Sequence, residues 1–66
     1  MPIVRVELWP GKPHEVKRKV AKAITEVMVE NIGCPAQAVT VLFDERSQEN
    51  WAIGGELCNT IFKDLK

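Results

Sequence analysis

The second residue of this chain is a proline, in the segment Met1-Pro2-Ile3-Val4, and a proline at an amino terminus can do acid–base chemistry. If Met1 is removed, the nitrogen of Pro2 becomes a free secondary amine, whereas the nitrogen of any other proline is held in a peptide bond. An α-amino group has a pKa of about 8, and desolvation or a nearby cation lowers that pKa because both disfavour the charged form. Such a base suits proton transfer at neutral pH. Pro2 is therefore a candidate general base, although proline also begins strands at little cost.

Other reactive side chains form no cluster in the sequence. Cys34 and Cys58 do not make a CxxC pair, and His14 has no neighbours with the spacing of metal ligands. No histidine is placed to activate either thiol, so both cysteines are interpreted as packing residues. Neither a metal nor a cofactor is expected.

Charge and hydropathy exclude several classes of function. Nine basic and nine acidic residues give a formal net charge of zero, and neither sign forms a long run, so nucleic-acid binding is not predicted. No apolar stretch approaches the roughly 20 residues of a membrane span. The first residues alternate between apolar and charged, unlike a signal peptide. A cytoplasmic protein with reduced thiols is the expectation.

A strand and a helix are predicted to follow Pro2. Ile3 to Trp9 alternates in character, as a strand does, and the turn residues Pro10-Gly11 end it. Pro13 suits the first position of a helix, and Gly33 suits the left-handed position after its end. From His14 to about Asn31 the apolar residues recur at three and four, which predicts one buried stripe of an amphipathic helix: Val16, Val20, Ala23, Ile24, Val27 and Met28. The run Lys17-Arg18-Lys19 is interpreted as a solvated face.

A second strand and a hairpin complete the predicted fold. Ala38 to Asp44 alternates again, and the order strand–helix–strand predicts two parallel strands joined by a right-handed crossover. Gly54-Gly55 between two short apolar runs predicts a tight hairpin over Trp51 to Leu57. The tail, Cys58 to Lys66, is weakly amphipathic and is predicted to form a short helix or to pack on a neighbour. The predicted fold class is α/β (α+β), a β-α-β unit with a C-terminal β-hairpin, and residues 1–66 form a single domain.

The size of the chain favours assembly with other copies. A chain of sixty-six residues buries so little surface that it is only marginally stable alone, and its two cysteines allow at most one disulfide. One helix covers only one face of a parallel sheet, whereas such sheets are normally covered on both. A homo-oligomer is therefore predicted.

Taken in order, several segments resemble the 4-oxalocrotonate tautomerase family of the tautomerase superfamily, over nearly the whole length. They are the start Pro2-Ile3-Val4, the turn Pro10-Gly11-Lys12, Pro35 after the helix, the strand Val39 to Phe43, and Ile53-Gly54-Gly55-Glu56-Leu57 just after an aromatic residue. The resemblance implies a hexamer, described as a trimer of dimers. It also implies an isomerase that moves a proton within a dienol or keto acid, as in the catabolism of aromatic hydrocarbons.

The resemblance also implies roles for particular residues. Pro2, after loss of Met1, takes the place of the catalytic base. Lys12 takes the place of the cation that binds a substrate carboxylate, and Trp51 takes the place of the aromatic residue that keeps the site apolar. The expected partner is a small enol or keto acid.

Two positions depart from the best-known members of the family. Lys12 stands where those members have arginine, and it lacks the planar fork that binds a carboxylate with two hydrogen bonds. Thr40 stands where they have a second-strand arginine that a neighbouring subunit contributes, and a threonine supplies a hydrogen bond but no charge. The dicarboxylate 2-hydroxymuconate is therefore a less obvious substrate, and Arg46 and Arg5 are candidates for the missing cation.

Two other interpretations remain open at this point. One is a hydratase or dehalogenase of the same superfamily, in which Pro2 stays protonated as an acid while a carboxylate activates water. The other is a non-catalytic oligomeric protein that binds a partner or a small acid, which a retained Met1 would favour because the nitrogen of Pro2 would then be an amide.

Overall fold

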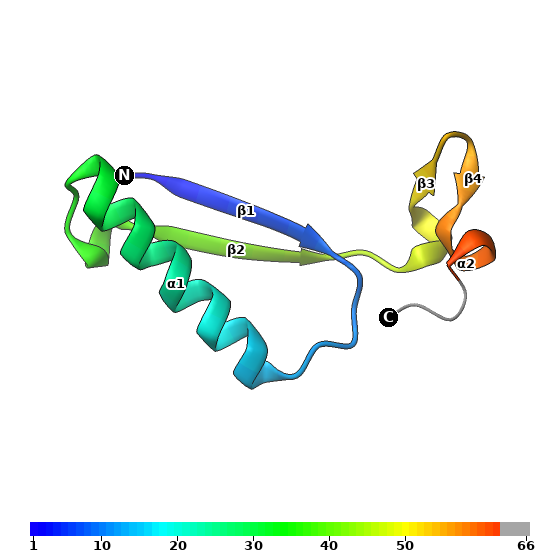
Figure 1. The fold of residues 1–66 in the computed structure, drawn as a ribbon, viewed down its shortest axis with the longest axis horizontal. Coiled ribbons are helices and arrows are strands. Elements are labelled where there is room, and N and C mark those ends of the chain that lie inside the picture. The colour runs from blue at the N-terminus through cyan, green and yellow to red at the C-terminus, as the bar shows by residue number, and fades with distance from the viewer. Residues whose placement is uncertain (63–66) are drawn as a thin grey trace.

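The predicted strand–helix–strand order is present in the structure, a computed structural model that describes residues 1–62 (Figure 1). The β-α-β unit is followed by a small antiparallel hairpin and one short helix, which confirms the predicted fold class. Residues 63–66 of the predicted tail lie outside the described residues. In chain order the elements are β1 (Ile3–Leu8), α1 (His14–Ile32), η1 (Ala36–Ala38), β2 (Thr40–Glu45), η2 (Gln48–Asn50), β3 (Ala52–Ile53), β4 (Glu56–Leu57) and α2 (Cys58–Ile61).

The strands β1 and β2 are parallel, and their register runs from Ile3 opposite Thr40 to Leu8 opposite Glu45. Burial follows the predicted alternation along β1, because the side chains of Val4, Val6 and Leu8 are half-buried and those between them are exposed. The exposed face of the sheet, called here the open face, comprises six side chains: Ile3, Arg5, Glu7, Thr40, Leu42 and Asp44. No element within the described residues covers the open face.

Proline and glycine set the ends of α1. Pro13 lies one residue earlier than predicted, at the N-cap, with ψ of 157° and its carbonyl accepting a hydrogen bond from the N–H of Val16 at 3.1 Å. Gly33 has φ of +84° and donates its N–H to the carbonyl of Val29 at 3.0 Å, as expected for a left-handed C-cap.

The predicted buried stripe of α1 is only partly buried within one chain. Ile24 and Met28 are half-buried, whereas Val16, Val20 and Val27 keep 41%, 38% and 55% of their surface exposed. The single-stripe prediction was therefore wrong for the isolated chain. The helix has two adjacent apolar stripes: a half-buried one with Ile24 and Met28, and an exposed one with Val16, Val20 and Val27. The two-stranded sheet is too narrow to cover both stripes.

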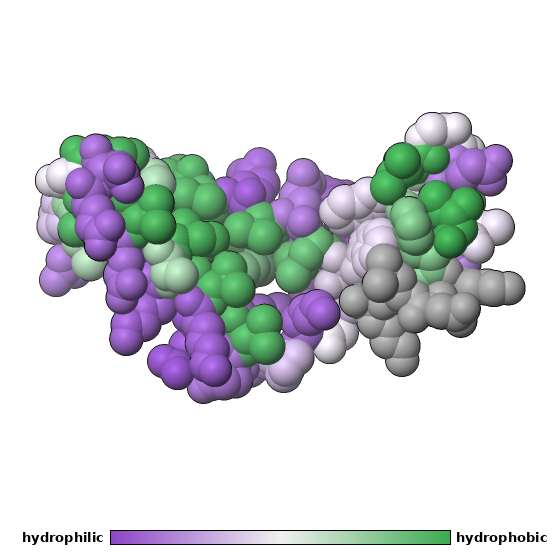
Figure 2. Space-filling model, viewed as in Figure 1, coloured by the Kyte–Doolittle hydropathy of each residue, from purple (hydrophilic) through white to green (hydrophobic). Residues whose placement is uncertain are grey.

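The chain buries little of its apolar surface. Cys58 is the one fully buried side chain among residues 1–62. The radius of gyration is 14.8 Å, against about 11 Å for a compact chain of this length. Apolar side chains are visible between α1 and the strands and again on the hairpin (Figure 2). Neither helix within the described part of the chain is both long and apolar enough to cross a membrane.

Candidate active site

Pro2 lies directly before β1, at the end of the sheet where β2 begins. Its side chain is half-buried, and its carbonyl accepts a hydrogen bond from the N–H of Thr40 at 3.0 Å. Met1 is 89% exposed. Its peptide bond to Pro2 is therefore at the surface, and its removal would leave a secondary amine at the end of the strand.

Thr40 is the first residue of β2 and lies opposite Ile3 in the register. Its side chain is exposed on the open face. The structure thus brings two of the predicted site residues, Pro2 and Thr40, together within one chain. It leaves the threonine hydroxyl without a hydrogen-bond partner within residues 1–62, so this hydroxyl is available to a ligand or to a second copy.

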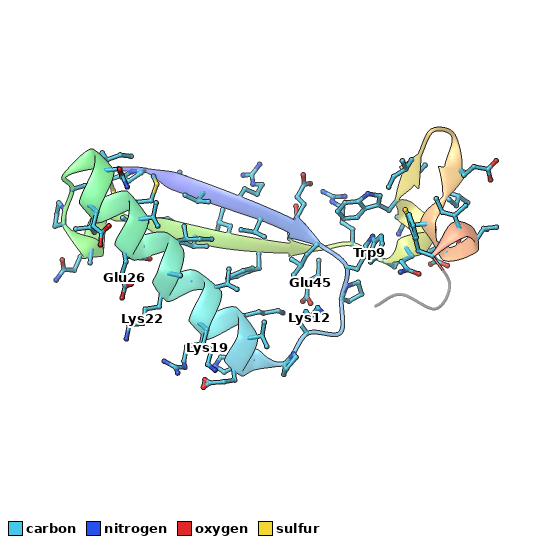
Figure 3. The ribbon with its side chains drawn as sticks, in the orientation of Figure 1. Trp9, Lys12, Lys19, Lys22, Glu26 and Glu45 are labelled. Carbon is cyan, nitrogen blue, oxygen red and sulfur yellow. The ribbon has the colours of Figure 1, made fainter. Side chains whose placement is uncertain are left out.

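Lys12 lies at the other end of the sheet, in the loop between β1 and α1 (Figure 3). Gly11, just before it, has φ of +109°, a backbone conformation that only glycine adopts readily. The Lys12 side chain is exposed and forms no ion pair within the described residues, whereas nearby Lys17 does. It is therefore a cation that can bind an anion from outside the chain.

Trp51 belongs to an aromatic cluster at the same end as Lys12. Its ring packs edge-on against the ring of Trp9, with centroids 5.9 Å apart and an interplanar angle of 76°. The ring of Phe62 lies 5.8 Å from that of Trp9 on a tilted plane. No role was predicted for Trp9, although its aromatic side chain lies only three positions before Lys12 in the sequence.

The indole N–H of Trp9 is buried and has no hydrogen-bond partner among residues 1–62. A buried donor without a partner costs on the order of 1–3 kcal/mol. Trp9 thus offers an unsatisfied donor within the same cluster as Trp51.

Ion pairs occupy other charged residues at the Lys12 end. Lys17 reaches from α1 to Glu45 at the end of β2, with Nζ 2.7 Å from Oε1, so part of the predicted solvated run is half-buried. Arg46 lies between two acidic side chains: its Nε is 3.5 Å from Glu7 Oε1, and its Nη2 is 3.3 Å from Asp44 Oδ2. The charge of Arg46 is therefore already paired with the carboxylates of Glu7 and Asp44.

The candidate residues do not meet within one chain. Pro2 precedes a six-residue strand and Lys12 follows it, so the two are separated by about 20 Å. Trp51 lies beyond the same far end, because its ring contacts Trp9, which Figure 3 shows at that end. Pro2 with Thr40 forms one half of the candidate site, and Lys12 with Trp51 forms the other. No group of three or more histidine, cysteine or acidic side chains within the described residues could hold a metal ion.

Comparison with known proteins identifies the chain at the level of its family. The sequence profile of the family described as "Tautomerase enzyme" matches residues 2–61. The chain belongs to the tautomerase family. Tautomerases move a proton within one molecule, so this chain is an isomerase.

Named relatives agree with this assignment to the tautomerase family. A "Probable tautomerase" of Streptococcus pneumoniae is 37% identical over 57 residues, which cover 86% of this chain and 95% of the relative. The "2-hydroxymuconate tautomerase" of Comamonas testosteroni is 33% identical over 55 residues, which cover 83% of this chain and 87% of the relative.

Solved structures place the chain among the 4-oxalocrotonate tautomerases. TomN, a 4-oxalocrotonate tautomerase homologue of the tomaymycin biosynthetic pathway, superposes with a TM-score of 0.89 at 29% identity and covers 94% of this chain and 95% of that one. A 4-oxalocrotonate tautomerase isozyme from Methylibium petroleiphilum superposes with a TM-score of 0.85 at 33% identity and covers 91% of this chain and 97% of that one.

Proposed function

We propose that this tautomerase isomerises a 2-hydroxydienoate or a related unsaturated keto acid, with Pro2 as the general base after Met1 is removed. The ring nitrogen of Pro2 takes the proton of the substrate hydroxyl, and the O–H electron pair becomes part of a carbonyl. The double bonds shift along the chain, and a C–H bond forms at a distant carbon with the proton that Pro2 returns. The substrate and product have the same atoms and Pro2 is regenerated, so the proposed reaction needs no cofactor.

The observation that carries the proposal is the place of Pro2 in the chain and in the fold. The match to the tautomerase family begins at residue 2, and Pro2 stands at the open end of β1 behind an exposed Met1. The sheet would fix the position of a secondary amine at that point, because the carbonyl of Pro2 accepts a hydrogen bond from the N–H of Thr40. An anchored base is what positioned proton transfer requires.

The second half of the site is proposed to come from another copy of the chain. Because β1 separates Pro2 from Lys12 and Trp51, one small substrate cannot touch all three residues of a single chain. In the proposed composite site, Lys12 of a neighbouring copy binds a substrate carboxylate by charge. Trp51 of that copy excludes water, which strengthens the electrostatic interaction. Thr40 donates a hydrogen bond beside Pro2.

Exposed apolar side chains support the assembly that such a site needs. They lie in three places: on the open face (Ile3 and Leu42), on α1 (Val16, Val20 and Val27) and on the hairpin region (Ile53, Leu57 and Ile61). We propose a stable homo-oligomer, with the hexamer of the family as the expected size. Light scattering at micromolar concentration tests the assembly, and a folded monomer would contradict both it and the composite site.

Pro2→Ala in protein from which Met1 has been removed tests the catalytic base. The substitution keeps an amine but makes it primary and loses the fixed ring geometry, so turnover of a 2-hydroxydienoate should fall at least about tenfold. Ultraviolet absorbance follows the reaction, and intact mass establishes the loss of Met1 in both proteins. Unchanged turnover would remove Pro2 from the mechanism, and a fully retained Met1 would favour a non-catalytic binding protein.

Lys12→Ala tests the carboxylate-binding role. An exposed ion pair contributes about 1 kcal/mol or less, and a desolvated one contributes more, so the rise in KM reports how dry the site is. If kcat/KM is unchanged, another residue binds the carboxylate.

A further inference from the structure

Cations are unevenly distributed along the molecule. Five of those within residues 1–62 lie at the end of the sheet opposite Pro2: Lys12, Lys17, Arg18, Lys19 and Arg46. The strands β1 and β2 contain one cation between them, which is Arg5. The last turn of α1, which lies near the amino terminus in Figure 1, contains no basic residue. Arg5 is thus the nearest strand cation to Pro2.

Arg5 lies on the same face of the sheet as Thr40, the residue whose backbone N–H is hydrogen-bonded to Pro2. It is the third residue of β1, exposed on the open face, and its register partner is Leu42. Thr40 precedes Leu42 by two residues on the same face of β2, and so it is a diagonal neighbour of Arg5. Arg5 lies about 10 Å along the strand from Pro2, given three residues of rise.

Arg5 and Arg46 differ in how their charges are used. Arg46 is held by Glu7 and Asp44. Arg5 forms no ion pair and no side-chain hydrogen bond with any residue of the described range 1–62, and Glu7, the nearest acid on its face of β1, is taken by Arg46. An exposed arginine beside an open strand end therefore keeps its full charge and all its donors for a ligand.

The chemistry at Pro2 creates a need for such a cation. When the substrate hydroxyl loses its proton, negative charge develops on that oxygen, next to the base and to the adjacent carboxylate of a 2-hydroxydienoate. A fixed cation at that position lowers the barrier, because the interaction is stronger in the transition state than in the ground state. The planar fork of an arginine can bind two neighbouring oxygens at once.

We propose that Arg5 is a catalytic residue that stabilises the charge on the substrate oxygen deprotonated by Pro2. This inference rests on the proposed function. It assigns different roles to two cations that form no ion pair within residues 1–62: Lys12 of a neighbouring copy binds the substrate, and Arg5 stabilises the transition state. The substrate is held between them, with its reacting end over the open face.

The test compares Arg5→Gln with Arg5→Lys and with Arg46→Gln, all in protein lacking Met1, on one 2-hydroxydienoate. Arg5→Gln should lower kcat at least about tenfold, in the direction seen when oxyanion donors are removed. Arg5→Lys should recover part of the loss because it keeps the charge without the fork. Arg46→Gln should leave kcat within about twofold of wild type, since its charge serves Glu7 and Asp44.

A second-site variant separates catalysis from structure. Thr40→Arg in the Arg5→Gln background returns a cation to the same face and should restore part of kcat. Light scattering at the assay concentration checks that all variants keep the wild-type assembly. The inference is overturned if Arg5→Gln changes only KM, if its loss follows dissociation of the oligomer, or if Arg46→Gln shows the larger loss in kcat. Wild-type protein that is inactive, or activity that survives Pro2→Ala, contradicts the proposed function instead.

Discussion

At the residue scale, the ring of Trp9 holds the aromatic cluster together, while its N–H has no partner in the described part of the chain. Its ring contacts both Trp51 and Phe62, and it is the member common to the two contacts. The same residue carries the one buried side-chain polar atom without a partner in residues 1–62. Ring and N–H therefore act in opposite directions on stability.

Two substitutions separate these contributions. Trp9→Phe removes the unsatisfied donor but keeps an aromatic ring, so the free energy of unfolding should stay within about 1 kcal/mol of wild type. Trp9→Ala removes the ring as well and should cost about 2 kcal/mol, less than a fully buried ring because Trp9 is half-buried. Urea denaturation at one fixed protein concentration measures both. If Trp9→Phe proves as harmful as Trp9→Ala, a ligand or a second copy pairs with the N–H.

For single residues, the sequence predicted those features that depend only on neighbouring residues in the chain. Gly33 was predicted as a left-handed helix cap and is one. The candidates Pro2 and Thr40 are brought together by the parallel register, which the alternation of two segments made predictable. The pairing of Arg46 with Glu7 and Asp44 was not predictable, because it depends on where the chain leaves β2. That pairing is what distinguishes Arg46 from Arg5.

At the element scale, the hairpin depends on two successive glycines. Gly54 and Gly55 have φ of +59° and +84°, the pattern of a type I′ turn. A Cβ built on either glycine would meet no atom within 4 Å. The requirement for glycine is therefore one of backbone conformation and not of space within the chain.

Substitutions at Gly54 should reflect backbone preference alone. Gly54→Val should destabilise the protein by about 1–2 kcal/mol, the cost of a left-handed conformation for an ordinary residue. Gly54→Asn should cost less than about 1 kcal/mol, because Asn-Gly is favoured in this turn. Thermal unfolding at equal protein concentration compares the two. Equal losses would indicate that a neighbouring copy packs against the turn.

Element order was predictable from periodicity, whereas burial was not. Alternation predicted both long strands to within two residues at each end, and the spacing of apolar residues predicted α1. The three-residue helix η1 was missed because Ala36–Ala38 lacks any periodic pattern of its own. The prediction treated the two apolar stripes of α1 as one buried stripe, because a sequence pattern does not show how much of the sheet is available to cover a helix.

At the scale of the whole molecule, the elongated chain leaves large apolar side chains exposed within residues 1–62. Val27, on the exposed stripe of α1, keeps 55% of its surface exposed, and Ile3, on the open face, keeps 64%. Burial of such side chains contributes on the order of 1.5–3 kcal/mol each. Stability of this tautomerase should therefore depend on protein concentration.

Val27→Lys tests whether this stripe is an interface. A lysine there would place a charge in a surface that assembly covers, so the oligomer should dissociate or weaken at least about tenfold in its dissociation constant. Glu30→Gln, on the same helix, changes the net charge by the same amount at an exposed position and serves as the control. Analytical ultracentrifugation measures both. Wild-type assembly of Val27→Lys would place the interface elsewhere on the chain.

The separation of Pro2 from Lys12 by the full length of β1 has a consequence for mixtures of defective chains. Two impaired variants, Pro2→Ala and Lys12→Ala, each lack a different half of the proposed composite site, so each can complement the other. Co-expressed in equal amounts and assembled at random, they should regain intact sites at about a quarter of all positions. Each variant alone should regain none. A double variant carrying both changes in one chain should disable two sites in each oligomer that it joins, so an equal mixture with wild-type chains should keep about a quarter of its sites instead of half.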